Sequence, residues 1–370
     1  MDQLAALNPE ILFRPLHLNG LELKNRIVMA PMTRKFSPGG VPGANVADYY
    51  RRRAEGGVGL IITEGTTIGR PAASNNVDIP NFHEPASLAG WAGVVSAVHS
   101  AGGRIAPQIW HQGLSRKPDS GPRPDAPSEG PTESDPGTKA MTDVDIADTV
   151  EAFANAAAAA RRIGFDAVEI HGAHGYLIDQ FLWADTNGRT DAYGGNAIER
   201  TRFATEVVRA VRTAVGPDFP LMFRYSQWKP QDYSARLAET PEALEALLAP
   251  LADAGVDAFH ASTRRFWQSE FEGSDLNLAG WTRKLTGRPA ISVGSAGLGG
   301  EDFSRQLMGN STGAPVAGLD DLVRRMEAGE FDLIAIGRAL IGNPDWPTLV
   351  RTGEVDRLNP FDKTMLSTLA

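Results

Sequence analysis

The feature that most constrains the fold is one pattern repeated along the chain: a short β-branched apolar run, a loop, then a helical stretch of roughly ten to twenty residues. The run occurs eight times. Strands that alternate with helices are typical of parallel sheets with crossover helices, and eight such strands can close a barrel. The sequence therefore predicts an α/β fold, a (β/α)8 TIM barrel. The expected strands are residues 27–30, 59–64, 104–110, 167–171, 221–225, 258–262, 290–294 and 333–337.

Several of the expected outer helices carry their own start or periodicity signals. Thr240 precedes Pro241, which predicts an N-cap with proline in the first turn and a helix over residues 240–254. Residues 143–162 are rich in alanine, and residues 197–215 place apolar side chains at helical spacing.

Two further features surround the predicted barrel. Asn19-Gly20 lies between two short apolar runs and predicts a tight β-hairpin at the barrel floor. Connections 66–85, 112–142 and 263–277 are longer than a barrel needs, so we expect extended loops at its catalytic face. No composition break suggests a second domain, and residues 1–370 are expected to form a single one.

Composition excludes several function classes. A net charge of -9 argues against a nucleic-acid partner. The absence of cysteine excludes disulfides, thiolate zinc sites, iron–sulfur clusters and a thiol nucleophile. Residues 1–12 lack a signal-peptide pattern and the small-apolar run 152–160 is too short to span a bilayer, which predicts a cytoplasmic protein without a membrane partner.

Polar residues stand at the C-terminal ends of the predicted strands, where such barrels place their active sites. Gln108 lies in an apolar strand and needs a partner, either a ligand or a polar turn. Arg224 would be buried and needs an anion, either a ligand or a structural Glu or Asp. Thr33 follows the first strand and is either a ligand contact or a turn residue.

His171 and His174 lie close to Glu169 and could suggest a metal site. No third ligand is evident, and the strand followed by a turn does not match a helical zinc motif, so we predict no metal. Tyr176 is a phenol that stays protonated near neutral pH and is suited to general-acid catalysis; the alternative is a wall aromatic.

At these residues the sequence resembles the Old Yellow Enzyme family of FMN-dependent ene-reductases, over residues 12–346. The most specific segment is residues 168–182, VEIHGAHGYLIDQFL. It is followed by Asn187, Arg189, Asp191, Tyr193-Gly194-Gly195 and Glu199-Arg200. The segments Ala30-Pro31-Met32-Thr33-Arg34, Gln108-Ile109-Trp110-His111 and Gly337-Arg338 occur in the family's order.

The resemblance implies a tightly but non-covalently bound FMN. It assigns Thr33 to the O4/N5 edge of the flavin, Gln108 to the pyrimidine edge and Arg224 to N1 and the C2 carbonyl. Glycines and Arg338 after the seventh and eighth strands would hold the phosphate. The implied cofactor residues are Ala30, Pro31, Met32, Thr33, Gly65, Gln108, Arg224, Gly294, Ser295, Gly337 and Arg338.

The resemblance also implies a ping-pong reaction in which NAD(P)H reduces FMN and an electron-poor alkene then takes the hydride. His171 and His174 would donate hydrogen bonds to the carbonyl or nitro oxygen of the alkene, and Tyr176 would protonate the α-carbon. Trp110 matches the family position that shapes the substrate pocket; the alternative is a core aromatic. Independently of the resemblance, the aromatic residues Phe266 and Trp267 are expected to add a hydrophobic wall to that pocket. The resemblance leaves open the choice between NADH and NADPH, and between monomer and homodimer.

Two other functions remain open on sequence alone. One is a flavin-free barrel lyase or isomerase that binds a phosphorylated substrate between Gly294 and Arg338; the other is a flavin-binding protein without turnover. The family's larger members with an iron–sulfur cluster are not expected, because cysteine is absent. Elsewhere, residues 187–193 are expected to form a hydrogen-bonded loop frame, residues 51–53 a solvated arginine face, and His260 receives no role.

Overall fold

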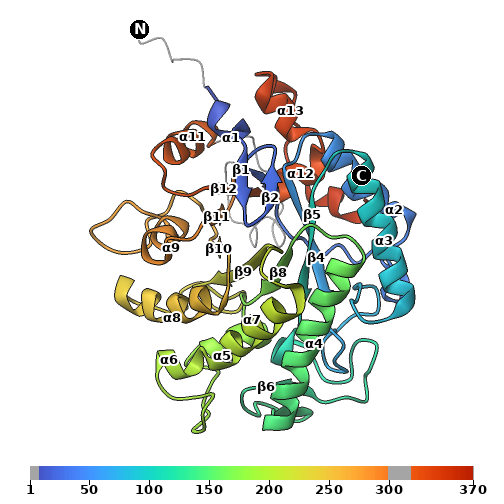
Figure 1. Ribbon diagram of the computed structural model, residues 1–370, viewed down its shortest axis with the longest axis vertical. Coiled ribbons are helices and arrows are strands. Elements are labelled where there is room, and N and C mark those ends of the chain that lie inside the picture. The colour runs from blue at the N-terminus through green and yellow to red at the C-terminus, as the bar shows by residue number, and fades with distance from the viewer. Residues whose placement is uncertain (1–7, 299–317, 370) are drawn as a thin grey trace.

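The eight predicted strands form a closed barrel in the computed structural model, which describes residues 8–298 and 318–369 (Figure 1). Each strand is parallel to both neighbours, which confirms the predicted TIM barrel. That residues 1–370 form one domain stays a prediction. The segment 1–12, in which the sequence shows no signal-peptide pattern, lies partly outside the described residues. In barrel order the strands are β3 (Ile27–Met29), β4 (Leu60–Thr67), β5 (Ile105–Trp110), β8 (Val168–His171), β9 (Leu221–Ser226), β10 (Ala258–Ser262), β11 (Ala290–Val293) and β12 (Leu333–Ile336).

The barrel interior is a packed core of its own. Alternate residues of each strand point inward, so Ala106, Ala167, Met222 and Ala258 lie in one buried cluster near the floor. Two residues further along the same strands, the inward positions become polar. The interior therefore changes from apolar at the floor to polar at the mouth.

The N-terminal hairpin closes the floor as predicted. Strands β1 (Leu16–Leu18) and β2 (Leu21–Leu23) pair antiparallel through Asn19 and Gly20, whose φ angles of 37° and 82° suit a two-residue turn. Leu18, Leu21 and Leu23 of this hairpin are buried in the inner cluster of the barrel.

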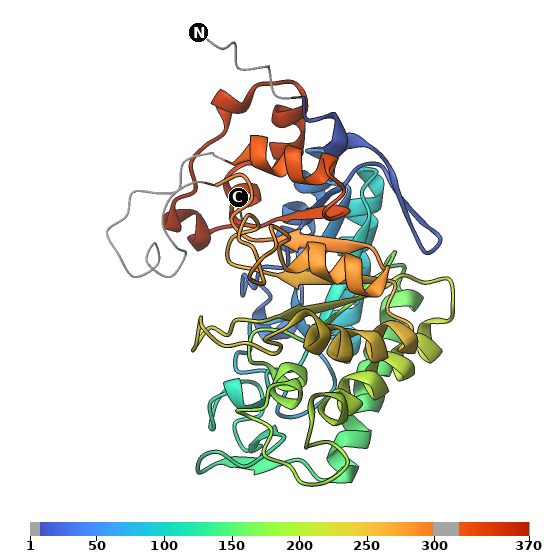
Figure 2. The same ribbon diagram turned by 90° about the vertical axis from the view of Figure 1, so that its left-hand side faces the viewer.

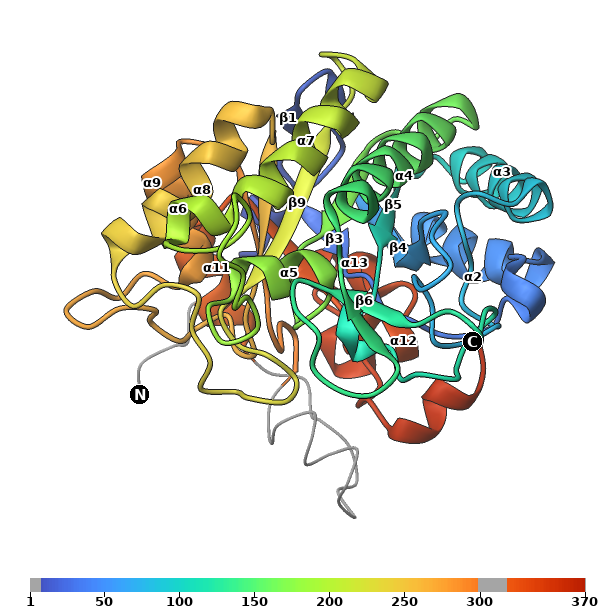
Figure 3. The same cartoon turned by 90° about the horizontal axis from the view of Figure 1, so that it is seen from below.

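The helices form an outer ring around the strands (Figure 3). Thr240 caps its helix by accepting from the Ala243 N–H, and Gly255 ends it with φ 118°, as the sequence indicated. The expected 197–215 helix is interrupted at Thr201. The helices are α1 (Glu10–Phe13), α2 (Ala44–Glu55), α3 (Pro85–Ser100), α4 (Asp143–Arg162), α5 (Leu177–Leu182), α6 (Ala197–Arg200), α7 (Arg202–Val215), α8 (Pro241–Ala254), α9 (Leu278–Thr286), α11 (Leu319–Glu327), α12 (Arg338–Gly342) and α13 (Trp346–Arg351). In the described part of the chain, no helix is long and apolar enough to cross a membrane.

The long 112–142 connection is an ordered excursion at the lower end of Figure 2. It contains strands that the sequence did not predict, β6 (Ser128–Gly130) and β7 (Thr138–Ala140), which pair with each other. The buried guanidinium of Arg116 donates to the carbonyl oxygens of Ser74, Ala126, Ser120 and Arg123. One arginine thus replaces the regular hydrogen bonding that a proline-rich loop lacks.

The prediction that residues 51–53 of α2 form a solvated arginine face is wrong for Arg53. Arg51 and Arg52 are partly exposed and pair with Asp48. Arg53 is fully buried, stacks 3.7 Å from the ring centroid of Tyr49, and donates to the Leu340 carbonyl at 2.9 Å. This arginine ties α2 to the carbonyl groups of α12.

Candidate active site

The candidate site lies at the C-terminal ends of the barrel strands, where a cavity of about 210 Å³ opens. Seven residues predicted to bind the cofactor line it together: Ala30, Pro31, Met32, Arg224, Ser295, Gly337 and Arg338. They come from β3, β9, β11 and β12, or from the loops that follow these strands. The fold thus brings together residues that are far apart in the sequence.

Arg224 lies in the wall of this cavity and is almost fully buried. Its Nη2 donates to the Ser262 hydroxyl at 3.4 Å, while its Nε has no hydrogen-bond partner among the residues that the structure describes. Burial lowers the pKa of Arg224 and the charge of Glu169 opposes that effect, but the described residues include no salt bridge to Arg224. The alternative of a structural ion pair is therefore not found among the described residues, and Arg224 can serve an anionic or carbonyl-bearing ligand.

A hydrogen-bonded group of three buried side chains lies inside the barrel beside Arg224. Gln108 Nε2 donates to Glu169 Oε1 at 2.7 Å, and His260 Nδ1 lies 2.7 Å from Glu169 Oε2. Burial is the largest cause that lowers the pKa of His260. The sequence indicated neither a hydrogen-bond partner for Glu169 nor a role for His260, although the alternation of inward positions along β5, β8 and β10 could have grouped them with Gln108.

Arg338 and Ser295 form the outer end of the cavity. Arg338 Nη2 donates to Ser295 Oγ at 3.4 Å, and burial lowers the pKa of Arg338 to about 10. Gly294 has φ 145°, and a Cβ there would lie 2.7 Å from the Thr263 carbonyl oxygen, so only glycine fits this turn. The turn brings the backbone, the hydroxyl and the guanidinium close to one another, as a phosphate site requires.

Gly65 has a packing role that the sequence did not indicate. Strand β4 continues past the predicted end, with a register shift between Ile62 and Gly65. A Cβ on Gly65 would lie 2.5 Å from Trp110 Cε3, so glycine makes room for the indole. Contact of Gly65 with the cofactor stays a prediction, as does the flavin contact of Thr33, whose side chain is exposed just beyond β3.

Four aromatic or imidazole rings gather over the mouth. The ring centroids of His171 and His174 are 5.2 Å apart, and those of His171 and Tyr176 are 5.0 Å apart. Trp110 stacks on His171 with an interplanar angle of 19° and meets the edge of Tyr176 at 4.8 Å. The predicted catalytic residues and Trp110 are therefore neighbours.

Both imidazoles are neutral at physiological pH. Burial, followed by the charge of Arg224, lowers the pKa of His171 and of His174 well below 6.5. Nδ1 of His171 accepts from the Ala173 N–H at 3.3 Å, which leaves the proton on Nε2. Nε2 of His174 lies 2.8 Å from the Ser262 hydroxyl, which already accepts from Arg224 and can donate to this nitrogen, placing the proton of His174 on Nδ1.

A buried ion pair supports the loop that carries His174 and Tyr176. Asp179 accepts the Gly175 N–H at 2.6 Å and pairs with Lys229 Nζ at 2.8 Å, and both side chains are fully buried. His174 has a positive φ of 63°, and its N–H donates to the Ser226 hydroxyl at 3.0 Å. The loop conformation is therefore fixed from α5 and from the segment after β9.

The motif residues after α5 form a hydrogen-bonded frame, as the sequence suggested. Asn187 Nδ2 donates to the carbonyls of Phe181 and Tyr193, each at 2.7 Å. Arg189 Nη1 donates to the carbonyls of Pro131 and Met141. This frame joins the 112–142 excursion to the barrel.

The structure does not place Phe266 in the cavity wall, where it was expected. Phe266 is fully buried in the main core, and its carbonyl accepts from Asn277. Trp267 packs against the same core and meets Phe266 edge-on at 5.1 Å. Phe266 therefore fills core volume, whereas Trp267 stays partly exposed and its contact with a substrate stays a prediction.

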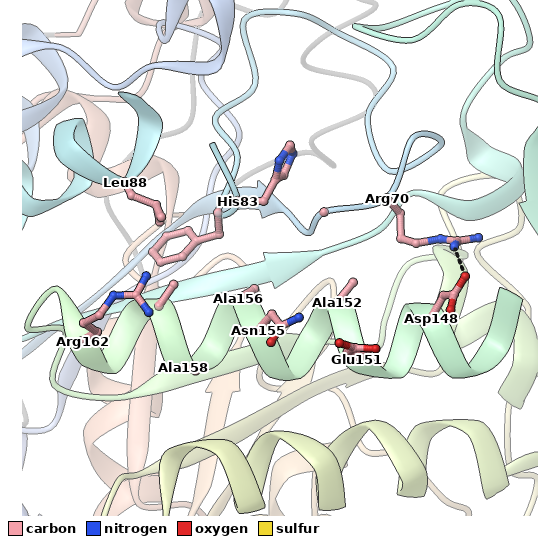
Figure 4. Close-up of a pocket in the computed structure, with 13 residues that line it drawn as sticks. Arg70, His83, Leu88, Asp148, Glu151, Ala152, Asn155, Ala156, Ala158 and Arg162 are labelled. Carbon is pink, nitrogen blue, oxygen red and sulfur yellow. Dashed lines mark hydrogen bonds and ion pairs between the residues drawn. The ribbon is translucent and has the colours of Figure 1, made fainter. Parts of the chain in front are cut away.

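A larger hollow lies on the outside of the barrel and is not a candidate for this chemistry. It encloses about 670 Å³ beside α4, with the alanine face of that helix as one wall (Figure 4). Arg70, at one end of the hollow, donates to Asp148 and is also paired with Glu129 and Asp145. The residues predicted to be catalytic or cofactor-binding do not line this hollow.

A buried carboxyl behind Thr33 gives a testable pH dependence. Glu64 Oε2 accepts the Arg34 N–H at 3.0 Å and the Lys35 N–H at 3.3 Å, and burial raises the pKa of Glu64 to about 7. Because this pKa lies above the unfolded value of 4.5, the folded state binds more protons between the two values, and Glu64 makes folding less favourable as pH rises through that range.

We therefore expect Glu64→Gln to gain stability relative to the wild type as the pH rises. Its free energy of unfolding should improve by about 2–3 kcal/mol, relative to the wild type, between about pH 5 and pH 8. Urea unfolding at both pH values measures this difference. Glu55→Gln, at an exposed position on α2, is the control and should show no such trend. A Glu64→Gln difference that does not vary with pH would contradict the raised pKa.

Comparisons with known proteins find similarity along most of the chain. Residues 11–305 match the sequence profile of the NADH:flavin oxidoreductase / NADH oxidase family. Chanoclavine-I aldehyde reductase fgaOx3 of Penicillium roqueforti is 35% identical over 355 residues, which cover 92% of this chain and 89% of that protein. The NADH oxidase of Thermoanaerobacter brockii is 33% identical over 94% of this chain, but the chain spans only 52% of that protein's length.

Solved structures show the same similarity. Morphinone reductase in complex with tetrahydroNAD superimposes with a TM-score of 0.78 and 32% identity, over 96% of this chain and 93% of that one. The old yellow enzyme homologue from Zymomonas mobilis gives a TM-score of 0.79 with 27% identity, over 96% of each chain. The similarity therefore extends over the whole barrel.

Proposed function

The chain belongs to the NADH:flavin oxidoreductase / NADH oxidase family, the Old Yellow Enzymes, and from this premise we propose that it is an ene-reductase that uses NAD(P)H and FMN to reduce electron-poor alkenes. The observation that carries the proposal is the cluster of two neutral imidazoles and a phenol at the C-terminal end of β8. The Ser262 hydroxyl links this cluster to a buried, incompletely paired arginine that lines the cavity. Proposed substrates are α,β-unsaturated aldehydes, ketones and imides, and nitroalkenes.

The donor set of the cavity fits FMN. Arg224, with its Nε lacking a described partner, would face the N1 and C2 carbonyl side of the ring, and Gln108 would meet the pyrimidine edge. Ser295, Arg338 and the backbone at Gly294 and Gly337 would hold the phosphate. When bound, FMN would accept hydride from the reduced nicotinamide and pass it to the alkene.

The chain's own residues would bind and polarise the alkene. His171 offers its Nε2 proton, and His174 its Nδ1 proton, to the carbonyl or nitro oxygen of the substrate. Because both rings are neutral, they donate hydrogen bonds without giving up a proton, and they stabilise the negative charge that develops on this oxygen. Trp110, stacked on His171, would limit the position of the substrate.

Tyr176 would supply the proton to the α-carbon. Burial is the main cause that raises its pKa above 10, so the phenol is protonated at neutral pH. Its contacts with Trp110 and His171 fix the ring beside the oxygen-binding imidazoles. The proton donor and the two hydrogen-bond donors thus come from the last residue of β8 and the loop that follows it.

The test is anaerobic reduction of the purified protein by NADH and by NADPH, followed by reoxidation with a panel of enones. We expect a yellow protein that bleaches with the reductant and recovers its colour with the enone. The rate of this recovery should not depend on the oxidised nicotinamide, because a ping-pong mechanism releases it before the enone binds. A colourless folded protein that fails to retain added FMN would refute the proposal that FMN is the cofactor. A yellow protein that enones do not reoxidise would instead support a flavin-binding protein without ene-reduction.

A further inference from the structure

The carboxylate of Glu169 is buried at the centre of the barrel, directly among the groups proposed to meet the flavin. Its side chain is fully buried, and it lies next to Gln108 in the pairing of β5 with β8. A carboxylate in the interior is costly unless it is hydrogen-bonded, and the two described partners, Gln108 and His260, both reach it at 2.7 Å. The proposed reaction gives this carboxylate no part.

The chemistry of Glu169 determines the orientation of the Gln108 amide. Because Gln108 Nε2 donates to Glu169 Oε1, the amide NH₂ of Gln108 faces Glu169 and its carbonyl oxygen faces the other way. His260 supports this state, because a neutral imidazole that donates from Nδ1 occupies the second carboxylate oxygen. Without Glu169, the Gln108 amide could flip by about 180° at little cost in free energy.

We propose that Glu169 is a positioning residue that makes Gln108 present its carbonyl oxygen, together with the second N–H of its amide, to the pyrimidine edge of the flavin. This proposal rests on the proposed function. The pyrimidine edge of FMN carries an N3–H donor between two carbonyl acceptors, so an oriented amide matches it and a reversed amide places N–H against N–H. Glu169 therefore selects the amide orientation that binds the cofactor.

The proposal predicts a specific pattern of FMN affinities. Glu169→Leu should raise the FMN dissociation constant about 10-fold, the effect of one lost hydrogen bond. Glu169→Gln should stay within about 3-fold of the wild type, because the new amide oxygen can still accept from Gln108 and His260 can change tautomer. Gln108→Leu should weaken binding by at least as much as Glu169→Leu, and adding Glu169→Leu to Gln108→Leu should have no further effect.

A second readout reports the orientation directly. If the Gln108 oxygen accepts from N3–H, the N3 proton of bound oxidised FMN leaves at higher pH than in free FMN, which an absorbance titration detects. Glu169→Leu should move this titration toward that of free FMN, and Glu169→Gln should restore it. A purely structural role for Glu169 would change the melting temperature but not the N3 titration of the folded protein.

The control is Glu330→Gln on the outer ring. Glu330 is also a buried carboxylate, paired with Arg325 at 2.9 Å, but it lies outside the barrel interior. It should lower stability and leave FMN affinity unchanged. If Glu169→Leu does not fold, His260→Phe removes the second donor to Glu169 and should move the N3 titration part of the way toward that of free FMN. A wild-type N3 titration in His260→Phe would then contradict the positioning role.

The outcomes separate this inference from the function on which it rests. Wild-type protein that does not retain FMN would overturn both. Gln108→Leu with wild-type affinity would refute the pyrimidine-edge assignment, and with it the positioning role. If Gln108→Leu binds FMN more weakly but Glu169→Leu keeps the wild-type FMN affinity and the wild-type N3 titration, only the positioning role is overturned.

Discussion

Replacing His171 and His174 together by alanine is expected to slow the reduction of an enone by ~10³-fold or more while the protein retains its FMN. The two imidazoles lie 5.2 Å apart over the mouth, and neither lines the 210 Å³ cavity proposed for the cofactor. Their loss therefore removes both hydrogen bonds to the substrate oxygen but leaves Arg224, Gln108 and Arg338 in place. Stopped-flow reoxidation of the reduced enzyme by the enone measures the effect.

The backbone at His174 calls for a second variant. With φ 63°, this residue adopts a left-handed conformation that alanine tolerates poorly and asparagine tolerates well. His174→Asn keeps an N–H donor and the backbone shape, so it should retain most of the activity that His174→Ala loses. His83→Ala, beside the outer hollow, is the control and should reduce enones normally. Normal turnover in the double alanine variant would refute the oxygen-binding role.

Lys229→Met is expected to lower the free energy of unfolding by about 3–5 kcal/mol, the largest stability effect that the structure indicates for a single side chain at this site. The change leaves the Asp179 carboxylate buried without its cation, although the Gly175 N–H still donates to it. Because Asp179 anchors the loop with His174 and Tyr176, the folded fraction should also show a lower kcat. Urea unfolding and steady-state kinetics measure the two effects.

The double variant Asp179→Asn, Lys229→Met tests the cause. Asparagine can accept the Gly175 N–H through its carbonyl oxygen and carries no charge, so we expect a substantial part of the lost stability to return. The pair Arg202–Glu206 on α7, in which Arg202 is exposed and Glu206 is half-buried, serves as the control, because Arg202→Met should change stability by less than about 1 kcal/mol. A double variant that is no more stable than Lys229→Met would contradict the assignment to an uncompensated charge.

The strands and the hairpin could be predicted because their signals are local. Each strand is a short apolar run, and Asn19-Gly20 has the backbone freedom that its turn requires. The cofactor-binding and catalytic residues could be located because they follow the strand ends and match a family motif. Their neighbourhood in space, as for Arg224 and Ser295 in one cavity wall, comes from the closure of the barrel.

The remaining features depend on partners that are distant in the sequence. Arg53 reads as part of a solvated face, because its acceptors, the Leu340 and Ile341 carbonyls, lie nearly three hundred residues further along the chain. Phe266 reads as a pocket aromatic, but the fold turns its loop back into the core. Glu169 was considered only as a metal ligand next to His171, since its real partners, Gln108 and His260, lie on other strands.

The leucine-rich hairpin beneath the barrel gives the two ends of the barrel different roles, packing at one end and the proposed site at the other. Leu18, Leu21 and Leu23 fill one end of the barrel interior, whereas the described residues that line the proposed cofactor cavity lie at the opposite end. We therefore expect mutational libraries directed at exposed positions of residues 112–142 to alter which alkenes enter without loosening the base of the barrel. The stability of the fold and the selectivity for substrates should accordingly be adjustable in separate rounds of engineering.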